Sequence, residues 1–310
     1  MKLSLVLATH NEEENIGDCI SSCKGLVDEI IVVDGASTDK TGDIARKLDA
    51  KVIVTDNPLM FHINKQKAIN LASGDWILQL DADERVSPEL AHEIKKVIEM
   101  PNDEIENHQQ ILSEKKLFIR HQQLSNPKYQ TLNHKQILNG QNLNPKHTEY
   151  NAFYIPRLNY FLGKYLRYGG VYPDGVIRLF RKGKAHLPCK SVHELMEVDG
   201  KIGWLQNPLL HYDSPTLQRY LERNNRYIDQ LVIELKAKKQ KLISKSKGQR
   251  VRVLLEHFNQ GIDWLFIKPI FWFILTTFRH KGMLDGWQGV IFSFFSALRF
   301  PRAYLRHISK

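Results

Sequence analysis

The chain has 310 residues and 42% of them are hydrophobic, which is enough for one large domain or for a domain with an appendage. Its formal net charge of +10 indicates an anionic partner, such as nucleic acid, anionic lipid or a phosphorylated substrate, without choosing among them. The only cysteines are Cys19, Cys23 and Cys189, and without a second pair or a nearby histidine they argue against a zinc site. We expect buried structural thiols in a reducing cytosol.

Residues 3–8 form a short, largely apolar run that polar and acidic residues follow at once, which predicts a buried strand rather than the apolar core of an export signal. Strand and helix patterns then alternate along the first hundred residues. Thr38 or Asp39 is the expected N-cap of the second helix. Ser87 is the expected N-cap of the fourth helix, and Pro88 follows at its first position. The expected strands are 3–8, 29–33, 52–55 and 76–80, and the expected helices are 15–24, 39–48, 62–72 and 88–98.

This alternation predicts an α/β fold with a mostly parallel, doubly wound sheet flanked by helices. Ligands of such sheets bind at the carboxyl ends of the strands. Asp34 and Asp81 each follow an apolar run directly, so we expect both to lie at that edge.

Residues 101–150 differ in composition, because they contain seven asparagines and seven glutamines but no valine or alanine. They lack sustained periodicity and are interpreted as a polar, partly mobile insertion over the active site, with a disordered surface loop as the alternative. Globular character returns after residue 150, with strand-like runs at 176–180 and 202–204 and a helical pattern at 217–236. Residues 1–235 are therefore expected to form one domain.

The last part of the chain, residues 236–310, is basic and aromatic. Eight lysines and arginines and no acid occur in residues 236–252. Two apolar, aromatic runs follow at 262–278 and 287–298, both shorter than the ~20 residues that a membrane-spanning helix needs. With the cations that flank them, these runs predict helices that lie on a membrane surface. A helical subdomain packed on the core, or an oligomer contact, is the alternative.

The strongest chemical motif is Asp81-Ala82-Asp83, which follows the strand expected at 76–80. Two carboxylates at a strand tip are suitable ligands for a hard cation such as Mg²⁺ or Mn²⁺, which could bridge the diphosphate of a bound nucleotide. Asp34 could accept hydrogen bonds from a nucleobase or ribose, although the turn after it also needs capping. A third polar segment, from Thr9 to Glu13, follows the first strand, where its acids could instead favour the helix dipole.

Taken in order, these segments resemble the family-two glycosyltransferases of the GT-A fold over residues 1 to 98. Further segments resemble the branch that includes bacterial lipopolysaccharide-core β-glucosyltransferases. These segments are 156–159, 169–174, 178–181, 192–194 and 210–212.

The resemblance implies roles for individual residues. Glu194 would be the base that activates the acceptor, with an ion pair to a nearby arginine as the alternative. Asp83 would bind Mg²⁺ or Mn²⁺, together with His211 unless that histidine is structural. Lysine replaces the arginine that many relatives have at position 65, so a bidentate contact to the diphosphate is lost. Residues implied to bind the nucleotide sugar are Thr9, Glu12, Asp34, Lys65 and Asp81.

These roles imply an inverting transfer from a nucleotide sugar, with uridine as the expected nucleoside, to a saccharide or a lipid-linked saccharide. We expect a cytoplasmic enzyme on the inner face of the cell membrane, with no nucleic acid partner. A nicotinamide dehydrogenase is excluded because the first strand lacks the Gly-x-Gly-x-x-Gly turn, and a P-loop kinase because its motif is absent. A nucleotidyltransferase and a non-catalytic protein that binds lipid or nucleic acid stay open.

Overall fold

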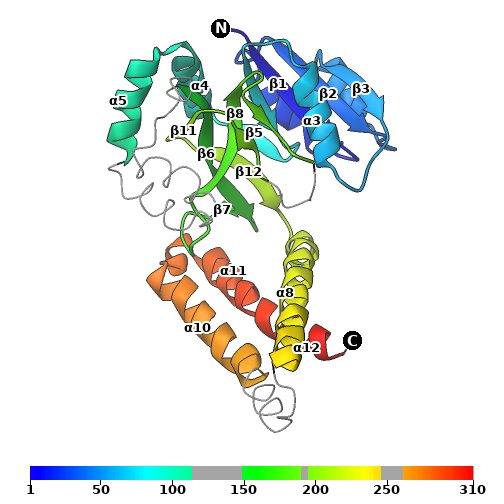
Figure 1. Ribbon diagram of the computed structural model, residues 1–310, viewed down its shortest axis with the longest axis vertical. Helices are drawn as coiled ribbons and strands as arrows, with labels where there is room; N and C mark the ends of the chain where they lie inside the picture. The colour runs from blue at the N-terminus through cyan, green and yellow to red at the C-terminus, as the bar shows by residue number, and fades with distance from the viewer. Residues whose placement is uncertain (114–148, 190–194, 246–260, 310) are drawn as a thin grey trace. The chain divides into compact units, whose positions relative to one another are not determined.

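The computed structural model describes residues 1–113, 149–189, 195–245 and 261–309. The chain forms two compact units, which are shown together with all elements in Figure 1. Unit 1 contains residues 1–158 and 173–211, and unit 2 contains residues 159–172 and 212–310. The expected domain boundary after residue 235 falls inside helix α8 (Leu217–Lys245).

The first half of the unit 1 sheet is parallel, as predicted. Its strands lie in the order β3-β2-β1-β4, and the pairs β1–β2, β1–β4 and β2–β3 all run in the same direction. Strands β1, β2 and β4 are mainly apolar because central parallel strands are covered on both faces, whereas the edge strand β3 is partly exposed. The bounds are β1 (Leu3–Thr9), β2 (Glu29–Gly35), β3 (Lys51–Thr55) and β4 (Trp76–Leu80).

Four helices connect or follow these strands where they were expected. Ser87 caps the fourth, since its Oγ accepts a hydrogen bond from the Leu90 N–H at 3.2 Å. The expected cap of the second helix was wrong, because Lys40 occupies the N-cap position, although Asp39 still accepts from the Thr41 N–H at 2.9 Å. The bounds are α1 (Ile16–Ser22), α2 (Thr41–Lys47), α3 (His62–Leu71) and α4 (Pro88–Glu99).

The second half of the sheet is largely antiparallel and continues from β4 in the order β8-β6-β12-β5. Strand β8 pairs antiparallel with β4 and with β6, β12 pairs antiparallel with β5, and β11 runs parallel to β6. Strands β9 (Ala185–His186) and β10 (Glu197–Val198) form a separate small sheet. The remaining bounds are β5 (Glu84–Val86), β6 (Tyr150–Phe161), β8 (Asp174–Arg181), β11 (Lys201–Trp204) and β12 (Leu209–Ser214).

The sheet separates two apolar clusters, because successive side chains of a strand point to opposite faces. Leu5 and Leu7 of β1 pack in a cluster with α1 and α4, whereas Val6 packs in a second cluster with Ala68 and Ile69 of α3. Buried apolar layers on both faces fix the register of the central strands. The polar edge of the sheet is therefore held by a rigid core.

The start of the polar segment 101–150 is helical, which corrects the expectation that it lacks regular structure. Helix α5 (Asn102–Ser113) is anchored to β11 by Gln109, whose amide donates to the Trp204 carbonyl at 2.9 Å and accepts from the Trp204 N–H at 2.7 Å. Ile105 and Leu112 are buried beneath it. Residues 114–148 lie outside the described part of the chain.

Unit 2 is mainly helical. The segment 159–172, with the short strand β7 (Lys164–Tyr165), contacts the turn at Asp285, whose buried carboxylate accepts from the N–H groups of Arg167 and Tyr168 at 3.2 and 2.8 Å. Among the residues that the structure describes, no helix is both long and apolar enough to cross a membrane. Besides α8, the elements are η2 (Asp263–Ile267), α10 (Lys268–Ile274), η3 (Leu275–Arg279), η4 (Gly282–Asp285), α11 (Trp287–Ala297) and α12 (Arg299–Ile308).

Candidate active site

The carboxyl ends of β1, β2 and β4 bring the predicted acidic residues to one edge of the unit 1 sheet. Thr9 is the register partner of Asp34, and Leu7 is that of Leu80, so the residues that follow all three strands are neighbours. Asp81 comes directly after β4. Three side chains that lie far apart in the sequence thus share one edge, the place where ligands bind in such sheets.

Asp81 forms ion pairs with two cations. Its Oδ1 lies 2.5 Å from Lys65 Nζ, and its Oδ2 lies 2.6 Å from an Arg178 guanidinium nitrogen. Burial would raise the pKa of Asp81, but the charges of Arg178 and Lys65 outweigh it and hold that pKa well below its usual range. Asp81 is therefore a carboxylate at neutral pH, and its ion pair holds Lys65 at the sheet edge.

The buried Arg178 also anchors the chain after Asp81. Its guanidinium donates to Gln79 Oε1 at 2.7 Å and to Glu84 Oε1 at 2.9 Å, and Glu84 is fully buried. The other oxygen of Glu84 accepts from the Asp81 N–H at 2.9 Å. Burial alone would lower the pKa of Arg178, but Asp81 and Glu84 raise it above the usual range. The loop with both aspartates is thus fixed by a charged network.

Arg157 of β6 extends this network. One guanidinium nitrogen lies 2.6 Å from Asp174 Oδ2 and another lies 3.5 Å from Glu84 Oε1. Its pKa is lowered by burial and raised more strongly by Asp174 and Glu84. The buried Arg178 and the partly buried Arg157 therefore share the carboxylate of Glu84, which fixes the antiparallel half of the sheet against the acidic loop.

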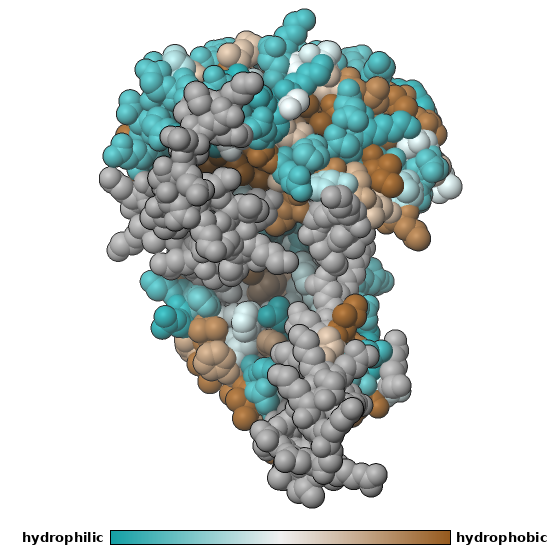
Figure 2. Space-filling view, in the orientation of Figure 1, coloured by the Kyte–Doolittle hydropathy of each residue, from teal (hydrophilic) through white to brown (hydrophobic). Residues whose placement is uncertain are grey.

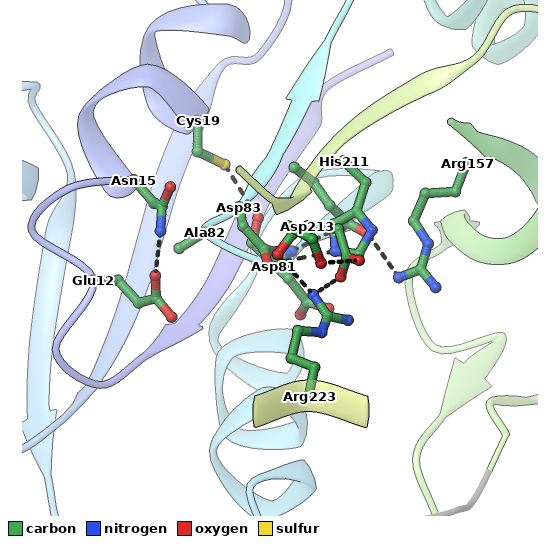
Figure 3. A network of polar contacts seen from close by, with 12 residues as sticks. Glu12, Asn15, Cys19, Asp81, Ala82, Asp83, Arg157, His211, Asp213 and Arg223 are labelled. Atoms are coloured by element: carbon green, nitrogen blue, oxygen red, sulfur yellow. Dashed lines mark hydrogen bonds and ion pairs between the residues drawn. The ribbon is translucent and has the colours of Figure 1, made fainter. Parts of the chain in front are cut away.

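Asp83 and His211, the two predicted metal ligands, lie together. His211 is the register partner of Glu84 in the β12–β5 pair, so it sits beside the acidic loop, and its Nε2 is 3.4 Å from Asp83 Oδ2 (Figure 3). The His211 side chain is almost fully buried. An imidazole and a carboxylate so arranged could bind a divalent cation or each other.

The loops after β1 and β2 form the other side of the site and are joined by hydrogen bonds. Thr41 Oγ1 accepts from the Glu12 N–H at 2.7 Å, and Asn11 Oδ1 accepts from the Thr38 N–H at 2.8 Å. Asn11 and Ala36 both have left-handed backbone conformations, with φ of 54° and 53°. For alanine this conformation is costly, and such strain is often found at binding sites.

Three predicted nucleotide-binding residues lie in these loops or next to them. The buried Thr9 Oγ1 has no hydrogen-bond partner among the described residues. Asp34 is buried and accepts from the N–H and hydroxyl of Ser37, so it does serve the turn that follows it. Glu12 Oε2 accepts from the Asn15 amide at 2.8 Å (Figure 3).

Several members of the charged network have no predicted role. Arg157 and Arg178 belong to segments of the family resemblance, and Gln79 and Glu84 lie close to the Asp81-Ala82-Asp83 motif. The sequence did contain a signal for this network, because an arginine within a strand-like apolar run requires a buried acid as its partner.

The predicted base Glu194 lies outside the described residues. The expected burial is confirmed for Cys19 and Cys23 but wrong for Cys189, which is only partly buried. The Cys19 thiol donates to the Asp81 carbonyl at 3.5 Å.

This combination of a sheet that is parallel in its first half with acids at the carboxyl ends of those strands defines an α/β protein whose candidate ligand site lies at that edge. The family model of Glycosyl transferase family 2 matches residues 4–162, which is just over half of the chain. The chain belongs to this family.

Proteins with sequences similar to this chain include several that are named as glycosyltransferases. An uncharacterized glycosyltransferase of Rickettsia felis is 41% identical over 128 residues, which cover 41% of this chain and 43% of the relative. The dolichol-phosphate mannosyltransferase of Pyrococcus furiosus is 31% identical over 115 residues, 33% of this chain and 32% of that protein. The chain thus spans less than half the length of these curated relatives.

A solved structure is also similar over a short stretch. Glucosyl-3-phosphoglycerate synthase of Mycobacterium tuberculosis, crystallised with Mn²⁺ and uridine-diphosphate-glucose, is 29% identical over 27% of this chain and 34% of that chain. The TM-score is 0.25, which is too low to define a common fold.

Proposed function

We propose that the chain is an inverting glycosyltransferase of the GT-A type, which transfers a sugar from a nucleotide sugar, with UDP as the expected nucleotide, to an acceptor of the cell envelope. The observation that carries this proposal is the position of Asp81 and Asp83 at the tip of β4, beside Thr9 and Asp34 at the tips of β1 and β2. Family membership supports it independently.

The nucleotide is assigned to the edge formed by β1 and β2. Asp34 and Glu12 are the acceptors for ribose and base N–H or O–H groups. The Thr9 hydroxyl, for which the described residues provide no hydrogen-bond partner, is a donor for the same ligand. Lys65, held by Asp81 at 2.5 Å, provides positive charge for the diphosphate. A lysine does this as a point charge, without the bidentate geometry of arginine.

Asp83 and His211 are the residues that would hold Mg²⁺ or Mn²⁺. No group of three or more His, Cys, Asp or Glu side chains in the described part of the chain is arranged to hold a metal. The pair still fits such a cation, because Mg²⁺ commonly takes one or two protein ligands and completes its shell with water and substrate phosphates. The chemistry that the cation supplies when bound is neutralisation of the negative charge on the departing diphosphate.

Glu194 is the proposed general base. It would take the proton of an acceptor hydroxyl, whose oxygen attacks the anomeric carbon while the bond to the diphosphate breaks, so that the configuration is inverted. A positioned base contributes ~10²–10⁴-fold to the rate. We therefore expect Glu194→Gln to lower transfer by roughly that factor while UDP binding, measured by calorimetry, is unchanged. A variant that also loses UDP affinity would place Glu194 in the donor site instead.

The acceptor is proposed to be a saccharide or a lipid-linked saccharide of the cell envelope, with the lipopolysaccharide-core β-glucosyltransferases as the branch of reference. This assignment rests on the segments around Arg157, Asp174, Arg178 and His211, which resemble that branch. We propose that the enzyme works from the cytoplasmic side of the membrane, where nucleotide sugars are available.

The decisive experiment measures UDP release from a panel of UDP-sugars, with and without Mn²⁺ or Mg²⁺, in the presence of a membrane lipid extract as the source of acceptor. We expect cation-dependent release from one donor and a loss on the order of 10²-fold in Asp83→Asn, which keeps the size of the side chain but removes its charge.

Asp43→Asn is the matched control, because Asp43 is an exposed aspartate of α2 that pairs only with its neighbour Arg46 among the contacts described. It should keep full activity. Undiminished turnover of Asp83→Asn after chelation of the metal would disprove the metal role. A failure of the wild type to bind any nucleotide sugar would favour the non-catalytic alternative.

A further inference from the structure

The helical segment 263–279 of unit 2 exposes six large apolar side chains and buries two threonines, although its Trp264 is also buried. Thr276 and Thr277 are 2% and 4% exposed. Six isoleucines and phenylalanines of the same segment are between 52% and 62% exposed. In a helix that packs on a water-soluble core the distribution is the opposite. The six residues are Phe266, Ile267, Ile270, Phe271, Ile274 and Phe278.

These exposed side chains lie on one side of the segment. Phe266, Ile270, Ile274 and Phe278 follow one another at intervals of four residues, which places them above one another on one helix face. Figure 2 shows hydrophobic surface along the lower left of the view, where α10 lies in Figure 1. The side chains therefore form a continuous apolar strip rather than scattered exposed residues.

The next elements continue the strip. Leu284 of η4 and Trp287 and Phe294 of α11 are half or more exposed, whereas the buried positions of α11 are Gly289 and small residues after it. Phe294 contacts Phe273 of α10, with 6.5 Å between ring centroids. We call the exposed apolar side chains of residues 266–294 the apolar face.

Small and hydroxyl residues form the packing on the buried side. A Cβ at Gly289 would lie 1.9 Å from the Gly282 carbonyl oxygen, so the backbones meet there without side chains. The hydroxyls of Thr276 and Ser293 donate within their own helices, to the Trp272 and Gly289 carbonyls at 2.8 and 2.9 Å. Close contact through small residues is typical of helices that are surrounded by lipid, because lipid offers no hydrophobic drive to bury the large ones.

Charge is distributed unequally between the two units. The residues of unit 2 include twenty lysines and arginines but only seven aspartates and glutamates, whereas the rest of the chain has 24 and 27. Arg279 and Lys281 directly follow the exposed segment, and Arg299 stacks over Trp272 at 4.4 Å. Unit 2 thus combines an apolar face with a strong excess of positive charge, as expected for contact with an anionic interface.

We propose that the apolar face docks on the surface of a lipid bilayer that contains anionic lipids, with the helices in the interface rather than across it. The apolar side chains would enter the boundary between headgroups and acyl chains, and the cations of unit 2 would contact the headgroups. This specifies which surface makes the membrane contact of the proposed function, but it holds whether or not the chain transfers a sugar.

The first test is flotation of the full-length protein with phosphatidylcholine vesicles, with or without phosphatidylglycerol. We expect binding to the anionic vesicles, weakened by salt. The double variant Ile270→Ser/Phe271→Ser should reduce partitioning roughly tenfold or more, because the transfer of each large apolar side chain is lost. The control Ile111→Ser/Ile233→Ser changes two equally exposed isoleucine positions outside the face and should bind like the wild type.

The second test uses Trp287 as a depth probe. Lipids with brominated acyl chains should quench tryptophan fluorescence on binding, and Trp287→Phe, which keeps the apolar surface, should bind equally but lose most of that quenching. Thermal unfolding of every variant without lipid verifies folding.

Three results would overturn the proposal. One is the absence of flotation with anionic vesicles, and another is equal binding by the face variant and the wild type. The third is a wild-type dimer in light scattering that the face variant converts to a monomer, without lipid binding in either, since the face would then be a contact between two copies. Equal binding to uncharged vesicles would overturn the role of anionic lipid.

Discussion

Arg178 joins the acidic loop to the sheet through Gln79, Asp81 and Glu84, so its loss removes one of two cations from Asp81 and the nearer of two cations from the buried Glu84. We expect Arg178→Ala to lower the free energy of unfolding by about 3–5 kcal/mol, the usual cost of breaking a buried ion pair on one side. Urea unfolding followed by circular dichroism measures this value.

The control for this substitution is Lys184→Ala, just after β8, where an exposed ion pair with Asp199 at 3.2 Å is removed. Surface pairs contribute about 0–1 kcal/mol, so its unfolding midpoint should barely move. Similar destabilisation by both variants would mean that the ion pairs of Arg178 contribute no more to the free energy of unfolding than an exposed surface pair does.

Cys23 illustrates how burial alone alters a side chain. Burial raises the pKa of its thiol to about 12, more than the Ser22 hydroxyl lowers it. The neutral thiol stabilises the native state fully below the pKa of the unfolded chain, ~8.5, and this stabilisation declines as the pH rises toward 12. We expect Cys23 to resist alkylation at pH 8 in the native protein and to react once the chain unfolds, as mass spectrometry after iodoacetamide labelling would show. Rapid native labelling of Cys23 would contradict this.

The acidic residues of the site could be predicted from the sequence, but their partners could not. Asp81 and Asp83 follow an apolar run, and that is a local signal. Arg178 and Asp81 are 97 residues apart, and only the antiparallel pairing of β8 with β4 brings them together. The same holds for His211, which reaches Asp83 through the β12–β5 pair.

Among the elements, α4 is the clearest case of a helix start that the sequence specifies. Ser87 accepts from the Leu90 N–H, and Pro88 occupies the first turn. We expect Ser87→Ala to lower the free energy of unfolding by about 1 kcal/mol, because one N–H at the helix start loses its partner. Differential scanning calorimetry measures the change.

Lys40→Ala is the matched variant for this test, since Lys40 occupies the N-cap position of α2 without a side-chain cap bond. Its effect should stay within about 0.5 kcal/mol. An equal loss in both variants would show that the Ser87 hydroxyl is not what stabilises α4.

The parallel strands β1 to β4 were predictable, as were β8 and β11 from the runs at 176–180 and 202–204, whereas β6 and β12 were not. Strand β4 has the expected bounds, 76–80, because a strand covered on both faces is a continuous apolar run. Strand β6 contains Asn151, Pro156 and Arg157, and β12 contains His211 and Asp213, so neither shows a clear alternation. The polar residues that interrupt the apolar pattern of these strands include Arg157, a member of the charged network.

For the molecule as a whole, the described residues that are proposed to bind the nucleotide sugar all lie in unit 1. UDP with Mn²⁺ at about one hundred times its Kd should therefore stabilise unit 1 by about 2.7 kcal/mol. Hydrogen exchange with mass spectrometry should find slower exchange in β1, β2 and β4 and unchanged exchange in α10 and α11. Protection confined to the helices would place the nucleotide elsewhere.

The route of the chain limits how this protein can be dissected. The backbone passes between the units three times, since residues 159–172 of unit 2 are flanked on both sides by unit 1. A gene shortened before α8 would still encode these residues but not Asp285, the acceptor for the Arg167 and Tyr168 amides. When C-terminal segments are exchanged between homologues, we therefore expect well-folded hybrids only if residues 159–172 are exchanged as well. Residues 159–172 and residues 212–310 should accordingly vary together among homologues.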